Sequence, residues 1–143
     1  MNNLKTLLCA WLGVLGGMIS SWFGGWNSAM TTLLVFMAID YLSGVILAGV
    51  FHRSGKTETG ALSSLVGFKG LCKKGMMLLI VLVSARLDLL LGSDFIRDSA
   101  CIALIVNELI SIVENAGLMG VPIPAIITKA IDSLHEKEDK THV

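Results

Sequence analysis

Four long apolar stretches, separated by short polar segments, follow one another along this chain. No charged side chain occurs between Lys5 and Asp40. A run of about 18 or more mostly apolar residues can cross the hydrocarbon core of a bilayer as a helix. The pattern therefore predicts an all-α membrane protein with about four transmembrane helices. The expected spans are residues 4–23, 28–51, 76–92 and 99–119.

The first stretch allows more than one interpretation. It is rich in glycine and serine, and such small residues let membrane helices pack closely. Lys5 followed by an apolar run also resembles a cleaved signal peptide, although the following SSWFGGWN contains no typical cleavage site. A loosely or reversibly inserted first helix is a further alternative. Trp22 and Trp26 flank a Gly-Gly turn, which favours a position at the lipid–water interface.

The last apolar stretch has a clear end. Pro122 and Pro124 cannot continue an ordinary helix, so we expect helix termination there. This boundary divides the chain into a transmembrane domain, residues 1–124, and a cytosolic segment, residues 125–143.

The cytosolic segment has an amphipathic pattern. Ile127, Ile131 and Leu134 fall on one face of a helix. We expect a short helix on the membrane surface, followed after Leu134 by a mobile, solvated charged tail. A frayed segment throughout is the alternative.

Basic residues are unevenly distributed between the expected loops. The segment 52–75 is strongly basic, whereas the turn at Gly24 and Gly25 has no charge. Lysine and arginine in short loops favour the cytosolic side. We therefore predict that both termini are cytosolic and that the cytosolic edge of the third helix carries three lysines: Lys69, Lys73 and Lys74.

Composition narrows the classes of function. The chain has 143 residues, of which 54% are hydrophobic and 15% charged, and its formal net charge is zero. This balance argues against a nucleic acid partner, which requires a basic face. The three cysteines and three histidines do not occur at metal-ligand spacing, and we find no catalytic motif. We expect no enzyme activity, metal or cofactor.

Charged residues inside the apolar stretches are the strongest functional candidates, because each costs about 2.5–3.5 kcal/mol or more at the centre of a membrane helix. At a rise of about 1.5 Å per residue, Asp40, Arg86 and Glu108 each lie roughly 16–18 Å from the cytosolic end of their stretch. We predict that Arg86 pairs with Asp40 or Glu108, within one subunit or between neighbours. The alternative is that these charges only hold the bundle together. The full set is Asp40, Arg86, Asp88, Glu108 and Glu114.

Polar residues in the fourth stretch form a stripe. At 100° per residue, five polar side chains fall within an arc of about 120°, and apolar residues cover the rest of the helix. Such a stripe can meet other subunits, pair with charges of its own bundle, or line a water-filled lumen. Its members are Asn107, Glu108, Ser111, Glu114 and Asn115.

Three sequence blocks resemble the toxin-secretion/phage-lysis holin family of bacteria and their phages, also called holin family 4. The blocks are IDYLSGVILAG (39–49), GFKGLCKKGMMLLIVLVSARLD (67–88) and NELISIVENAGLMGVPIP (107–124). Arg86 and Asp88 match the pattern more weakly. The positions that match are Asp40, Lys73, Lys74, Asn107, Glu108, Ser111, Glu114, Asn115, Pro122 and Pro124.

This resemblance implies a homo-oligomer in the bacterial cytoplasmic membrane that permeabilises it and so releases an endolysin or a protein toxin. Membrane lipid and other copies of the chain are then its direct partners, and the released protein needs no stable contact. A small ion channel or transporter, or a membrane scaffold subunit, is the alternative function.

Overall fold

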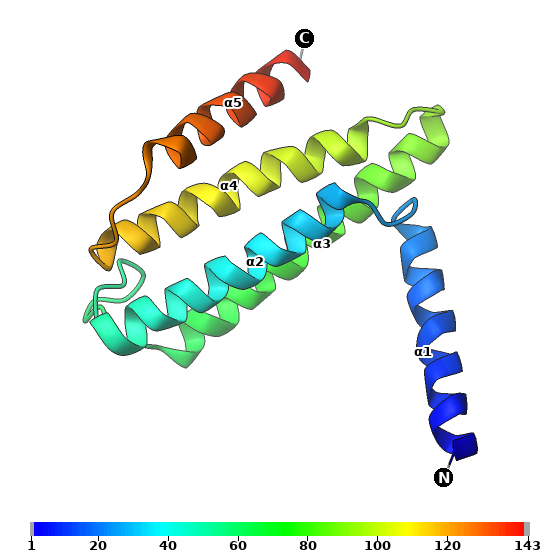
Figure 1. Ribbon diagram of the computed structural model, residues 1–143, viewed down its shortest axis with the longest axis horizontal. Coiled ribbons are helices and arrows are strands. Elements are labelled where there is room, and N and C mark those ends of the chain that lie inside the picture. Colours follow the sequence, from blue (N-terminus) through cyan, green and yellow to red (C-terminus); the bar gives the residue numbers. More distant parts are fainter. Residues whose placement is uncertain (1, 142–143) are drawn as a thin grey trace.

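The computed structural model describes residues 2–141, and every regular element in this range is helical. The described residues form five α-helices, and the second of them continues into a short π-helical turn (Figure 1). The all-α prediction is therefore confirmed. The elements are α1 (Asn2–Trp22), α2 (Ser28–Ile46), η1 (Leu47–Phe51), α3 (Ser64–Leu91), α4 (Ile96–Leu118) and α5 (Ala125–Thr141).

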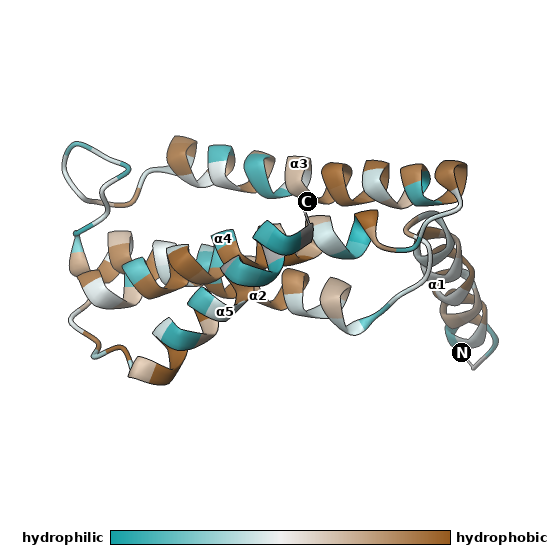
Figure 2. Cartoon of the chain, turned by 90° about the horizontal axis from the view of Figure 1, so that it is seen from above, coloured by the Kyte–Doolittle hydropathy of each residue, from teal (hydrophilic) through white to brown (hydrophobic). Residues whose placement is uncertain are grey.

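Helices α2, α3 and α4 form the bundle, and α4 lies at its centre because it packs against α2, α3 and α5. Seen from above, α3 forms one layer, while α2 and α4 together form another (Figure 2). Helix α1 diverges from this bundle and contacts it only near its C-terminal end (Figure 1). None of its residues from Asn3 to Trp22 is buried. The protein is therefore a three-helix bundle with two attached helices.

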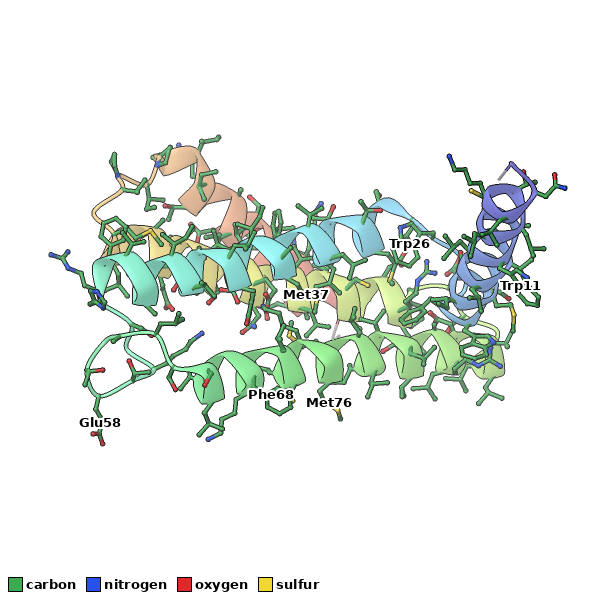
Figure 3. All side chains as sticks on the ribbon, turned by 90° about the horizontal axis from the view of Figure 1, so that it is seen from below. Trp11, Trp26, Met37, Glu58, Phe68 and Met76 are labelled. Carbon is green, nitrogen blue, oxygen red and sulfur yellow. The ribbon has the colours of Figure 1, made fainter. Side chains whose placement is uncertain are left out.

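The core of the bundle is a layer of apolar side chains from all three helices. Leu33 of α2, Val81 of α3 and Cys101 of α4 are completely buried. Met37 points into the space between the helices (Figure 3). Burial of such side chains inside the bundle leaves the opposite helix faces free for lipid. The whole layer consists of Met30, Leu33, Met37, Met77, Val81, Cys101 and Ile105.

Three helices of the described range are long and apolar enough to cross a membrane: Asn3–Trp22, Ser28–Phe51 and Ile96–Leu118. The third expected span is part of a longer helix, because α3 begins at Ser64 and not after a polar loop ending near residue 75. Its 28 residues extend for about 42 Å at the usual helical rise. This longer helix changes the depth of every charge that it carries.

The connection between α2 and α3 folds back on itself. Ser54 N–H donates to the carbonyl of Gly60 at 3.0 Å. Gly60 has a φ of 70°, and a Cβ there would lie 2.2 Å from the carbonyl oxygen of His52. Only glycine fits this close approach without a shift of the backbone. The turn positions residues 54–63 against the start of α3.

Helix α5 turns back and packs against α4 (Figure 1). Its expected apolar stripe is confirmed, because Ile127, Ile131 and Leu134 are half-buried. The helix continues beyond Leu134 to Thr141, and the mobility expected after Leu134 stays a prediction. Residues 142–143 lie outside the described range.

Candidate functional site

Three charged side chains, one from each helix of the bundle, meet in its interior. The Nζ atom of Lys74 in α3 donates to Oδ2 of Asp40 in α2 at 2.7 Å, and it also bonds Oε2 of Glu108 in α4. The side chains of Lys74, Asp40 and Glu108 are only 12%, 10% and 3% exposed. One cation therefore bridges two carboxylates in a site shielded from solvent. We call these three residues the ion cluster.

Two further polar residues extend the ion cluster along α2 and α4. Asn115 Nδ2 donates to Ser43 Oγ at 2.9 Å and, more weakly, to Asp40 Oδ1 at 3.4 Å. Among the described residues, every buried side-chain nitrogen or oxygen has a hydrogen-bond partner. A network that is fully bonded in this way can remain inside a membrane bundle without exposing a polar group to lipid.

The prediction that Arg86 pairs with Asp40 or Glu108 within one subunit is wrong, because Lys74 occupies that place. The cause is the early start of α3 at Ser64, which brings Lys74 to the depth of the two carboxylates. Arg86 lies 12 residues further along α3, or about 18 Å, toward the opposite end of the bundle. Its pairing between neighbouring subunits stays a prediction.

Asp88 belongs to a second polar cluster at that opposite end. Its carboxylate accepts hydrogen bonds from Ser93 Oγ at 2.6 Å, Ile96 N at 3.0 Å and Arg97 N at 2.9 Å. The last two are free N–H groups of the first turn of α4, where a negative charge is favourable. The structure therefore shows Asp88 as a helix cap formed across the α3–α4 turn.

Arg97 joins this second polar cluster, which we call the outer cluster, to the turn between α1 and α2. Its Nη1 atom donates to the carbonyls of Phe23, Gly24 and Gly25 at 2.8, 3.0 and 3.0 Å. Asp98 accepts a hydrogen bond from Asn27 Nδ2 at 3.0 Å and also pairs with Arg97. Sequence reasoning missed these residues because it read them as an ordinary polar loop. The consecutive opposite charges at the start of a helix were the available signal.

The polar stripe of α4 divides into two edges. Glu108 and Asn115 are buried against the neighbouring helices, whereas Asn107 and Glu114 are exposed, and Ser111 lies half-buried between them. The inner edge is occupied by bonds within the chain. The outer edge offers an exposed carboxylate and an exposed amide on a helix that can cross a membrane.

A partly open cavity of about 520 Å³ lies beside the ion cluster. It is bordered by the ends of α2, α3 and α4 that carry this cluster and by the 54–63 connection. Asp40, Lys74 and Glu108 line this cavity, and so do Asn107 and Glu114. The outer edge of the stripe and the ion cluster therefore face the same space, which can hold water. The cavity does not reach the apolar core layer.

The remaining predicted residues lie at the periphery. Lys69 and Lys73 are exposed in the first half of α3, and Lys73 lies at the border of the cavity. Pro122 and Pro124 follow the end of α4 at Leu118 and lie in the connection to α5, as expected for helix termination.

Long apolar helices around a buried, bonded ion cluster define a helical membrane protein with a polar interior at one end. The model of the bacteriophage holin family matches residues 17–136. The chain belongs to this family.

Individual relatives extend over most of the chain. An uncharacterized protein of Clostridium perfringens is 38% identical over 137 residues, which cover 93% of this chain and 96% of the relative. A second C. perfringens protein, described as an uncharacterized 14.9 kDa protein in the nagH 3' region, is 38% identical over 96% of this chain and its whole length. A probable holin of Bacillus phage phi105 is 30% identical over 76% of this chain and 75% of that protein. No solved structure matches.

Proposed function

We propose that this protein is a holin: it gathers as a homo-oligomer in the bacterial cytoplasmic membrane and opens lesions that let an endolysin or a protein toxin leave the cell. Membership of the bacteriophage holin family carries this proposal. The divided stripe of α4 adds a structural reason, because its outer edge leaves polar groups to be covered by another copy or by water.

The proposal includes α3 as a fourth membrane span. Its polar residues do not argue against this, because Lys74, Ser84 and Asp88 point inward and are bonded within the chain. Its exposed cations lie toward its two ends, with Lys73 and Arg86 separated by 13 residues, or about 20 Å. Long basic side chains near helix ends reach the interface while their stems stay in the apolar region.

Four spans place both termini on one side of the membrane. The basic residues of segment 52–75 then lie on the same side, which favours the cytosol for this end of the bundle. In that orientation the cavity beside the ion cluster faces the cytosol, and the outer cluster around Asp88 and Arg97 lies near the opposite surface.

The outer edge of the stripe gives a mechanism for assembly. Asn107 and Glu114 are exposed at the border of the open cavity and need a polar partner inside a membrane, so copies gain free energy when they turn these edges toward one another. In a closed array the edges are paired between copies. In an open array they face the water of the lesion, while the apolar outer faces remain in lipid.

Expression in a bacterium with and without a cytosolic endolysin tests the function. Lysis that depends on the endolysin supports the proposal, whereas ion leakage without release of protein favours a small channel. Unchanged permeability would favour a scaffold and refute the holin assignment.

A matched pair of substitutions tests the division of the stripe. We expect Glu114→Gln to change the time of lysis without loss of protein from the membrane. The Glu114 side chain is exposed and forms no ion pair within the described residues. Glu108→Gln should instead lower stability, because it removes one carboxylate of the ion cluster. Lysis timing and membrane immunoblots measure both effects. Normal timing for Glu114→Gln at normal protein level would contradict the role of the outer edge.

A further inference from the structure

The outer face of the first half of α3 combines exposed apolar and basic side chains. Leu65, Phe68 and Met76 are 60%, 64% and 58% exposed. Phe68 and Met76 point away from the bundle (Figure 3). Lys69 and Lys73 are exposed on the same half of the helix, one turn apart, and they form no ion pair within the described residues. We call these five residues the α3 outer face.

We propose that the α3 outer face binds an anionic phospholipid. The ammonium groups of Lys69 and Lys73 bind the phosphate of the head group, an acyl chain lies along Met76, and Leu65 and Phe68 lie beside the head group. The neighbouring Lys74 takes no part, because it points inward and is held by Asp40 and Glu108.

Charge complementarity and depth both favour lipid over a second copy at this face. The two lysines add two unneutralised positive charges to an otherwise apolar surface, which matches an anionic head group above acyl chains. From Lys69 to Arg86 there are 17 residues, or about 26 Å, close to the thickness of a hydrocarbon core of about 30 Å. Lys69 therefore lies at the edge of the hydrocarbon core when α3 crosses the bilayer, and Lys73, one turn deeper, reaches the head groups with its long side chain.

The apolar residues that precede Lys69 support the same position. Leu65 and Phe68 precede Lys69 in α3, so they lie further from the membrane centre than this lysine does. Water would be an unfavourable surrounding for two side chains that are each more than half exposed. The boundary between head groups and acyl chains accommodates aromatic, aliphatic and basic groups together.

Lipid titration of the purified full-length chain in a neutral detergent tests the proposal, with native mass spectrometry as the measurement. The probes are phosphatidylglycerol, phosphatidylcholine and inorganic phosphate. Each basic side chain near an anionic surface contributes about a five-fold preference, so Lys69→Gln/Lys73→Gln should weaken phosphatidylglycerol binding by about 25-fold. Phosphatidylcholine binding should not change.

The matched control is Lys129→Gln/Lys140→Gln, which removes two lysines from α5 and should leave lipid binding unchanged. Circular dichroism checks that both variants keep their helices. Equal binding of the two lipids to the unmodified protein would overturn the proposal, as would full phosphatidylglycerol binding by the Lys69/Lys73 variant. Competition by millimolar inorganic phosphate would show an anion site without lipid selectivity and would also overturn it.

The lipid proposal rests on α3 as a membrane span, which is part of the proposed function, but not on lesion formation. Lipid binding is measured on protein in detergent, and lysis is measured in cells. A chain that binds anionic lipid but causes no lysis would therefore refute only the holin assignment, and the reverse result would refute only the lipid site.

Discussion

Replacement of Lys74 by methionine should destabilise the folded bundle strongly, because it removes the only cation of the ion cluster and leaves two buried carboxylates. Lys74 Nζ and Asp40 Oδ2 lie 2.7 Å apart, and at an effective dielectric constant of 20 this pair attracts by about 6 kcal/mol. Desolvation offsets several kcal/mol of this attraction for each ion in the folded protein. Removal of one partner from a buried pair typically costs about 3–5 kcal/mol, which is the loss we expect.

Equilibrium unfolding of the purified protein in mild detergent, driven by added dodecyl sulfate and followed by circular dichroism, measures this loss. Lys73→Met is the matched control, because the adjacent lysine is exposed and should tolerate the same change. The triple variant Lys74→Met/Asp40→Asn/Glu108→Gln removes all three charges with little change of shape, so it should regain most of the stability. A Lys74→Met free energy of unfolding within about 1 kcal/mol of the unmodified protein would refute the structural role of the cluster.

The outer polar cluster gives two further predictions. Asp88→Ala should lower the free energy of unfolding by about 1–2 kcal/mol, because the first turn of α4 loses its cap, whereas Asp94→Ala at an exposed position should have little effect in the same titration. Arg97→Gln should speed hydrogen exchange of the turn at residues 23–25, because three carbonyl hydrogen bonds are lost. Exposed Arg86→Gln serves as its control, and equal exchange in both variants would contradict the anchoring role of Arg97.

The helices themselves could be predicted because their signal is local. Long apolar runs fixed the approximate limits of α1, α2 and α4, and the spacing of Ile127, Ile131 and Leu134 identified the stripe of α5. The polar stripe of α4 likewise follows from the angle between successive residues on one helix. Its division into a buried and an exposed edge could not be predicted, because burial depends on where α2 and α3 pack.

Lys74 could not be predicted as the bridging cation for a related reason. Lys73 and Lys74 are consecutive and differ by about 100° in direction on a helix, so only the packing of α3 decides which of them points inward. The basic residues near the start of α3 made its first turns resemble a loop, and the depth of Arg86 was then counted from the wrong end point. Hydropathy alone cannot separate a helical segment at an interface from a polar connection.

The arrangement of polar and apolar levels bears on where a passage through the membrane can form. On each bundle helix the core residues lie between the outer cluster and the ion cluster. On α2, Met30 to Met37 lie between Asn27 and Asp40, and the same order holds on α3 and α4. Leu33 and Val81 in this layer are completely buried, and the cavity lies on the side of it that holds the ion cluster. A single bundle is therefore closed by packed side chains, and opening it would expose its own core to water. The lesion that we propose would consequently have to form between copies, and the exposed edge of α4 with Asn107 and Glu114 is the polar surface that the described chain offers for its wall.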